Sequence, residues 1–268
     1  MIRALKDRII ETLSFIGMRV IEFLNQTGFT VLLFLDVTYH LKDLFVKRRE
    51  IFKHMYIAGI KTLFVCSLVG VFTGMILALQ TGIELKGLGQ QYMIGRLIIA
   101  SMTREMGPFM SAIILTASVG SAMAAELGTM KVYDEIDALE MMSISPVRLL
   151  VMPRVVSLST VLPVVSIYMT VLACIGGALV ASTVLQVSPN VYFKHLFKGI
   201  HFKAMYVGLL KAHVFGLLIS IISCAYGLRA TSGVVGVGNA TRQSVVASFL
   251  LVIIVGYIIT AMFYGGGS

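Results

Sequence analysis

Long apolar stretches separated by short polar segments dominate the pattern of this chain. A helix that crosses a bilayer needs about 20 predominantly apolar residues, and five stretches meet that length. They cover about Ile57–Leu79, Ile94–Ala125, Leu149–Leu185, 203–228 and 244–264. The pattern therefore predicts an all-α integral membrane protein with about five transmembrane helices in one membrane domain.

The N-terminal segment has an amphipathic pattern instead. Apolar residues recur every three or four positions up to residue 25, as on one face of a helix, at Ile2, Leu5, Ile9, Leu13, Ile16, Val20 and Leu24. Such a helix lies in the membrane interface or packs as a soluble helix on a partner. Residues 29–46 contain only a short apolar run followed by charges. We therefore predict an interfacial region over 1–46 and a transmembrane domain over 47–268.

An acidic segment separates the second and third predicted spans. Five acids are crowded into 15 positions, at Glu126, Asp134, Glu135, Asp137 and Glu140. On a helix, Val132, Ile136 and Leu139 would form a narrow apolar stripe. A short helix over Glu126–Met142 is either a solvated loop or a helix that docks into a groove on a cytoplasmic partner.

Composition and charge agree with a membrane setting. The chain is 57% hydrophobic and 13% charged, whereas soluble domains carry roughly 25% charged residues. Ten of the 22 Lys and Arg fall in the first 61 residues, as expected for a segment at the anionic cytoplasmic leaflet. The net charge of +9 therefore does not indicate nucleic acid, and the N-terminus is predicted to be cytoplasmic. Three cysteines in apolar runs, Cys66, Cys174 and Cys224, are predicted to be buried, and no metal site is expected.

Three ionisable residues lie inside predicted spans, where charge is costly and usually faces a cavity or a partner. Glu105 lies eleven residues from Ile94 and Lys211 eight residues from Lys203, which places both roughly 12–17 Å from the external end at about 1.5 Å per residue. Together with Arg104 they can form an ionic pair or a site for a lipid headgroup. The alternative is that Arg104 and Glu105 pair with neighbouring helices and that Lys211 extends towards the interface.

Small residues spaced by four indicate close helix packing within lipid. In the second predicted span, Ala117 is followed by Ser121, and Gly120 by Ala124. In the first span, Gly70 is followed by Gly74. Packing is the role we expect for all of them.

Several short motifs, in the same order along the chain, resemble those of the MlaE/YrbE family. Its members are the permease subunits of ABC transporters that move phospholipid with MCE-domain proteins. The motifs are GVFTGMILALQ (70–80), REMGP (104–108), VGSAMAAELGTMKV (119–132), EIDALEMM (135–142), SPVRLLVMPR (145–154) and TAMFYG (260–265). The resemblance covers roughly residues 50–268. It departs from the family at Ser118, where the family often has arginine, and at Gly256, where some members carry aspartate.

The resemblance implies a homodimeric, multi-pass permease of the bacterial inner membrane. A cytoplasmic ABC ATPase, a periplasmic MCE-domain protein and phospholipid would be its partners, and a small STAS-type regulatory subunit is left open. A charged cluster of Arg104, Glu105 and Lys211 would lie beneath the lipid cavity. The coupling helix to the ATPase would comprise Glu126, Lys131, Val132, Asp134, Glu135, Ile136, Asp137, Leu139 and Glu140.

We expect no cofactor and no enzymatic activity in this chain. It contains no G-x-x-x-x-G-K-[ST] loop, so ATP and Mg²⁺ would bind the partner ATPase. The nearest candidate, Gly233–Gly238, lacks the lysine and is predicted to be a flexible turn. A stand-alone secondary transporter would need coupling-ion ligands in broken helices and usually an internal repeat, and neither is visible. A membrane-embedded lipid-modifying enzyme would need a base with partners, and Glu105 has no histidine near it in sequence.

Overall fold

The structure is a computed structural model that describes residues 2–231 and 233–265. Of these, residues 2–16, 19 and 23 are described by their backbone alone. The described chain is helical almost throughout and contains no strand, which confirms the prediction of an all-α membrane protein. The predicted stripe residues Ile2, Leu5, Ile9, Leu13 and Ile16 lie outside the described side chains. The other two, Val20 and Leu24, are exposed.

The elements follow one another with short connections. The helices are α1 Ile2–His40, α2 Arg48–Gly87, α3 Ile94–Ser101, α4 Gly107–Leu115, α5 Ser121–Val132, α6 Glu135–Met141, α7 Met152–Thr183, α8 Pro189–Lys198, α9 Phe202–Leu228 and α10 Gly233–Tyr264. Turns of 3-10 helix occur at Leu41–Asp43 and Gln91–Met93, and π-helical turns occur at Met102–Met106, Thr116–Gly120 and Val147–Val151. Two π turns thus interrupt the segment that runs from α3 through α4 to α5.

Within the described residues, six helical segments are long and apolar enough to cross a membrane. They are Val20–Asp43, Arg48–Gly87, Gln91–Val132, Val147–Thr183, Phe202–Leu228 and Gly233–Tyr264. The last five contain or closely match the five predicted spans. The first lies outside the predicted spans, because residues 29–46 by themselves contain only a short apolar run. Since α1 continues unbroken through Asn25 and Gln26, the segment reaches 24 residues, and its most apolar 18-residue stretch has a mean hydropathy of 1.4.

The start of α10 also differs from the prediction. Gly233–Gly238 forms the first turns of this helix, so the expectation of a flexible turn is wrong. Glycine is a poor helix former, but here the end of α5 packs against the segment. A Cβ at Gly128 would lie 3.2 Å from Ala230 and 3.3 Å from Val237. This close packing explains why helix forms despite the three glycines.

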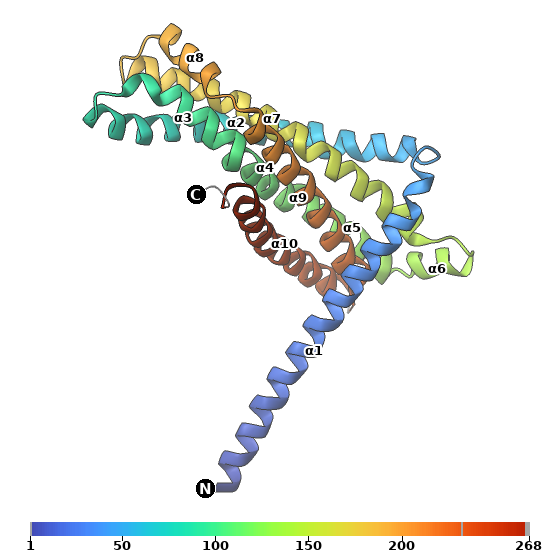
Figure 1. Cartoon of the computed structure of the whole chain (residues 1–268). Helices are drawn as coiled ribbons and strands as arrows, with labels where there is room; N and C mark the ends of the chain where they lie inside the picture. The colour runs from blue at the N-terminus through green and yellow to red at the C-terminus, as the bar shows by residue number, and fades with distance from the viewer. Residues whose placement is uncertain (1, 232, 266–268) are drawn as a thin grey trace.

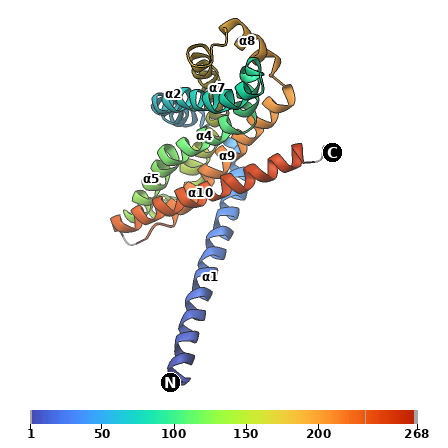
Figure 2. The ribbon, with the colours of Figure 1, turned by 90° about the vertical axis from the view of Figure 1, so that its left-hand side faces the viewer.

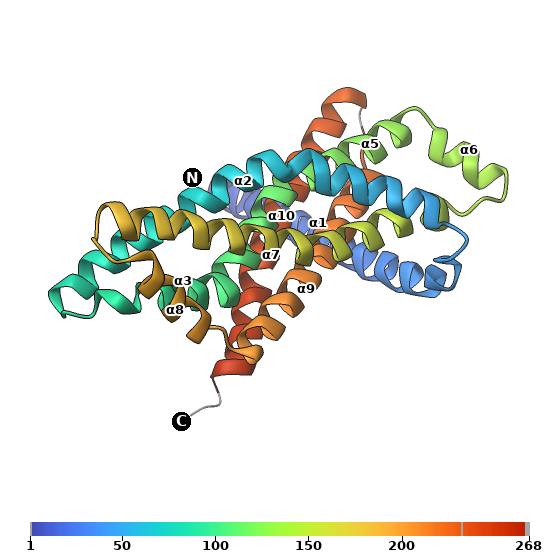
Figure 3. The ribbon, with the colours of Figure 1, turned by 90° about the horizontal axis from the view of Figure 1, so that it is seen from above.

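Helices α2 and α7 lie side by side along much of their length (Figures 1 and 3). They approach so closely that a Cβ at Gly74 would overlap the carbonyl group of Ala173, and one at Gly176 would overlap the carbonyl oxygen of Val71. At Gly70 a Cβ would lie 3.2 Å from the carbonyl oxygen of Met169. Small residues therefore allow backbone-to-backbone packing here, as expected in lipid.

Helix α9 contacts α1, α4, α5, α7 and α10. Helix α10 crosses α5 and α9 (Figure 2), and the N-terminal half of α1 projects away from the other helices (Figures 1 and 2). Helices α3 and α8 lie at one end of the molecule and α6 at the other (Figures 1 and 3). All three cysteines are buried, as predicted.

Of the small residues in the second span, two face α9. A Cβ at Gly120 would lie 3.0 Å from Oγ of Ser223, and Ala124 is buried opposite Gly227. Ala117 is exposed and Ser121 is half-buried. The spacing of four therefore places small residues on two faces of this segment. The face with Gly120 and Ala124 packs against α9, and the face with Ala117 and Ser121 lies towards the surface.

Candidate functional site

The structure brings Glu105 and Lys211 together inside the helical domain. The ammonium Nζ of Lys211 donates to Oε1 of Glu105 at 2.6 Å. Lys211 is 1% exposed, whereas the side chain of Glu105 is 45% exposed. The pair therefore has a deeply buried cation and a carboxylate that remains accessible from one side.

The backbone around Arg104 is shaped to receive this lysine. Arg104 and Glu105 lie in the π turn Met102–Met106, and Pro108 follows shortly after it. A proline has no N–H to donate to the carbonyl group four residues before it, which is the carbonyl of Arg104. Nζ of Lys211 donates to this carbonyl oxygen at 3.2 Å. The REMGP motif thus places next to one buried cation both an acid and a carbonyl that lacks its usual helical donor. Turns of π-helix are often found at functional sites.

Thr260 of α10 completes the surroundings of Lys211. Its hydroxyl oxygen accepts a hydrogen bond from Nζ of Lys211 at 2.6 Å. The same hydroxyl lies 2.9 Å from Oε1 of Glu105 and 2.8 Å from the carbonyl oxygen of Gly256, and it can donate to either. We did not identify Thr260 from the sequence, although it opens the TAMFYG motif.

Arg104 makes a separate contact with the end of α10. The carbon Cζ of its guanidinium lies 4.0 Å from the centre of the Tyr264 ring, and Nζ of Lys203 lies 5.4 Å from the same centre. Stacking of cations on an aromatic face is favourable, most of all where water is excluded. The Tyr264 hydroxyl is buried and has no hydrogen-bond partner in the described part of the chain. Helix α10 therefore holds the cluster together with two side chains, Thr260 and Tyr264.

The acidic segment is built differently from the prediction. Glu126, Lys131 and Val132 belong to α5, which continues the second span to Val132. The helix then breaks at Asp134, whose φ of 57° is left-handed, and α6 covers only Glu135–Met141. The single helix predicted over Glu126–Met142 is therefore wrong. Asp134 suits this break because aspartate tolerates the left-handed region better than most residues.

Helix α6 is held against its own chain and also presents side chains to the outside. Ile136 is buried, and Nζ of Lys131 lies 2.5 Å from Oδ1 of Asp137. Val132 and Leu139 are half-buried, so the predicted apolar stripe faces the protein. The exposed side chains on and beside α6 include Tyr133, Asp134, Glu135, Asp137, Glu140, Met141 and Met142.

Arg154 connects the two sides of this loop. Its Nη2 donates to Oε2 of Glu126 at 3.0 Å, which joins the end of α5 to the start of α7. The arginine side chain is 7% exposed, and its Nε and Nη1 have no partner among the described residues. In the sequence, Arg154 is only the last residue of the SPVRLLVMPR motif. Its role is not evident there, because a basic residue at the end of a transmembrane span is common.

Replacing Glu126 by glutamine is expected to destabilise the protein, because the buried Arg154 would lose its counter-charge. A hydrogen bond to a charged group contributes about 1.5–3 kcal/mol, and the exposure of Glu126 favours the lower end of that range. Thermal unfolding of the purified chain should show a lower Tm for Glu126→Gln. Glu140→Gln, at an exposed acid on α6, should leave the Tm unchanged; equal Tm values for both variants would contradict the role of the ion pair.

The fold defines an all-α protein with several candidate membrane spans, and comparison with known proteins assigns its class. The family model described as Permease MlaE matches residues 51–262. The chain belongs to the MlaE permease family. Probable ABC transporter permease proteins of Synechocystis and Rickettsia typhi are 32% and 35% identical to it, over 87% and 80% of this chain and 89% and 83% of theirs. The Arabidopsis thaliana chloroplast protein TRIGALACTOSYLDIACYLGLYCEROL 1 is 31% identical over 78% of this chain and 60% of its own length.

Proposed function

We propose that the chain is the permease subunit of an ABC transporter that moves phospholipid between the bacterial inner membrane and a periplasmic MCE-domain protein. Two copies would form the membrane part, with the N-termini in the cytoplasm. ATP would be hydrolysed on a separate cytoplasmic subunit. The observation that carries the proposal is the cluster of Lys211, Glu105 and Arg104 inside the spans of a chain that belongs to a permease family.

The chemistry of the cluster supports a phospholipid as the transported molecule. Glu105 is open on one side, and charged groups inside membrane domains commonly mark a substrate pathway. Arg104 can bind a phosphate group through two parallel hydrogen bonds. The chloroplast relative is named after a glycerolipid, which supports a lipid substrate over a small soluble one.

The exposed side chains of the loop that contains α6 support our proposal of an ATPase as the partner. A docked cytoplasmic subunit would contact the exposed apolar residues Tyr133, Met141 and Met142, of which Met141 is 89% exposed. Exposed acids around them add charge for orientation. Because Ile136 and the Lys131–Asp137 ion pair hold α6 in place, movement of a bound partner would be passed to α5 and α7.

Purification of the tagged chain from its native membrane tests this proposal, with mass spectrometry of the bound proteins and lipids. We expect an ATPase, an MCE-domain protein and phospholipid. Met141→Asp should reduce the recovered ATPase at least tenfold, because interface residues at the centre of a contact dominate its energy. Phe202→Asp changes an equally exposed residue at the start of α9, far from α6, and should keep the ATPase.

Other results would point to other classes of protein. Recovery of the chain without any ATPase, even after cross-linking, would contradict the proposal and favour a secondary transporter. Bound lipid with altered covalent structure would favour a lipid-modifying enzyme.

A further inference from the structure

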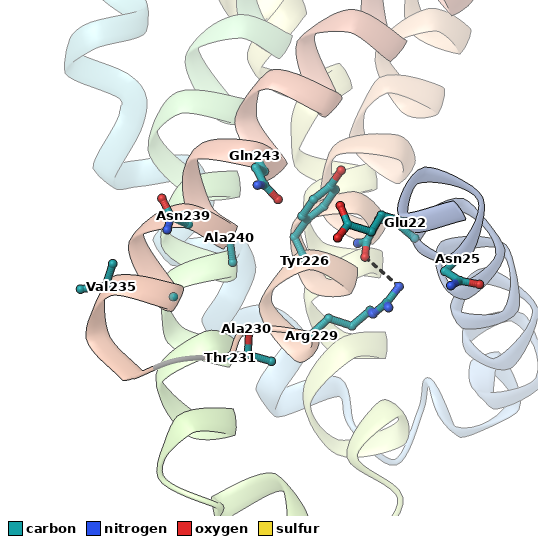
Figure 4. Close-up of a pocket in the computed structure, with 12 residues that line it drawn as sticks. Glu22, Asn25, Tyr226, Arg229, Ala230, Thr231, Val235, Asn239, Ala240 and Gln243 are labelled. Carbon is teal, nitrogen blue, oxygen red and sulfur yellow. Dashed lines mark hydrogen bonds between the residues drawn. The ribbon is translucent and has the colours of Figure 1, made fainter. Parts of the chain in front are cut away.

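A polar cavity lies between α1 and the turn that joins α9 to α10, at the same end of the molecule as α6 (Figures 1 and 4). Its volume is about 730 Å³. The polar side chains that line it are Glu22, Asn25, Gln26, Tyr226, Arg229, Asn239 and Gln243. Three helices therefore direct hydrogen-bonding groups into one space.

Two donors in this cavity are only partly used. Nη1 of Arg229 donates to Oε1 of Gln26 at 3.0 Å (Figure 4), but no carboxylate of the described residues lies within ion-pair distance of this guanidinium. The Gln26 amide nitrogen is buried and has no acceptor in the described part of the chain. An ionised phosphate oxygen would accept from both, and such charge-assisted hydrogen bonds are strong.

An apolar groove of about 340 Å³ is framed by the same three helices. Its apolar lining consists of Val31 and Phe34 of α1, Val214, Leu217, Leu218, Ile221 and Ile222 of α9, and Leu251 of α10. On α9, the last groove residue, Ile222, is one helical turn from Tyr226 of the cavity. On α1, the cavity residues up to Gln26 are followed by groove residues from Thr27 onwards. The cavity and the groove therefore follow one another along the same helices.

The length of the groove along α9 is close to the thickness of one leaflet of a membrane. The eight helical steps from Val214 to Ile222 span about 12 Å at about 1.5 Å per residue. Half of a hydrocarbon core is about 15 Å thick. An acyl chain in the groove would thus extend from the interface towards the bilayer centre, with its headgroup in the polar cavity.

We propose that α1, α9 and α10 bind one phospholipid with an amine-bearing headgroup in this cavity and groove. Arg229 and the Gln26 amide bind its phosphate, and Glu22, on the α1 side of the same cavity, receives its amine. The acyl chain lies against Phe34 and Leu218. The bound lipid fills the space between α1 and the other two helices.

This site is separate from the charged cluster around Lys211. Arg229 is 18 residues further along α9, about 27 Å at the helical rise. Residues Lys211 and Glu105 do not line the cavity or the groove. The proposal therefore holds whatever molecule the protein transports, and its test does not use transport.

Tryptophan fluorescence offers a direct test, because the chain has no tryptophan. Phe34→Trp would place one fluorophore in the groove, and Phe64→Trp, at an exposed position of α2, is the matched control. The full-length chain in detergent is titrated with phosphatidylethanolamine that carries brominated acyl chains, which quench tryptophan on contact. We expect saturable quenching of the groove tryptophan and weak, unsaturated quenching of the control.

Headgroup variants and charge variants complete the test. In the Phe34→Trp background, Arg229→Gln should raise the half-saturating lipid concentration roughly tenfold or more. Arg242→Gln, at an exposed cation of α10 outside the cavity, should not. Brominated diacylglycerol, which has no phosphate, and brominated phosphatidylglycerol, which has no amine, should both bind more weakly than phosphatidylethanolamine. Native mass spectrometry of the chain without added tryptophan should show one retained phosphatidylethanolamine that Arg229→Gln loses.

Several outcomes would overturn the proposal. Equal quenching at the two tryptophans, or equal effects of the three lipids, would mean that the groove makes only general acyl-chain contacts. An unchanged titration for Arg229→Gln would exclude the headgroup site. Absence of quenching at the groove tryptophan would mean that a second copy or another subunit covers it.

Discussion

Replacing Glu105 by alanine is expected to lower the Tm of the purified chain on the order of 10 °C and to abolish the phospholipid transport that we propose for it. The reason is that Lys211 is 1% exposed and would be left without the carboxylate that it contacts. Removing one partner of a buried ion pair costs about 3–5 kcal/mol. Thermal unfolding in detergent measures the first effect, and ATP-driven transfer of labelled phospholipid from proteoliposomes of the assembled transporter measures the second.

A double substitution separates the structural role of the pair from its functional role. In Glu105→Ala with Lys211→Met no buried charge is left, so much of the lost stability should return, since apolar replacements of buried pairs are often neutral. Transport should remain absent if the charges bind the lipid headgroup. Glu84→Gln, at an exposed acid on α2, should change neither property. A double variant that transports normally would show that the pair only stabilises the fold.

Replacing Gly74 by alanine is the second change from which we expect a large effect. The new Cβ would overlap the carbonyl group of Ala173 on α7, and a backbone group cannot rotate away as a side chain can. Overpacking of a dense interior costs about 1–3 kcal/mol, occasionally more, and a backbone clash should be at the upper end. Yield of folded protein and Tm should both fall.

The same helix provides a matched control. A Cβ at Gly59 would lie 3.8 Å from the nearest atom of Val161, an ordinary van der Waals contact. Gly59→Ala should therefore be neutral or slightly stabilising, because alanine is the better helix former. Equal Tm values for the two alanine variants would contradict the close approach of α2 and α7.

The sequence predicted the spans well where apolar residues run without interruption, and less well where they are diluted. The apolar segment Val20–Asp43 was not predicted because Glu22, Asn25, Gln26 and Asp36 interrupt it, although the helix is continuous up to His40. The start of α10 was missed because its glycines favour a turn when considered alone. Only the packing of α5 against this segment, which the local pattern does not contain, makes it helical.

The charged residues of the candidate site were predictable from the sequence, and its neutral residues were not. Glu105 and Lys211 were found because charged residues are conspicuous in apolar sequence. Thr260 was not found, because a threonine in a transmembrane helix usually bonds to its own backbone, and here it does that and contacts Lys211 as well. Arg154 was overlooked because its position at the end of a span resembles an ordinary interfacial cation; its burial is a tertiary property.

The close contact of α2 and α7 determines which parts of the molecule can move. At Gly74 and Gly176 the two backbones touch without side chains between them, so a shift of one residue along either helix would drive a Cβ into a carbonyl group. These helices must therefore translate and tilt as one rigid body. Helix α10, whose most apolar stretch is 11% buried in the chain, has no such restraint. A change of shape during a working cycle would displace α10 relative to the α2–α7 pair, and Thr260 and Tyr264 would move with it, opening or closing the surroundings of Lys211.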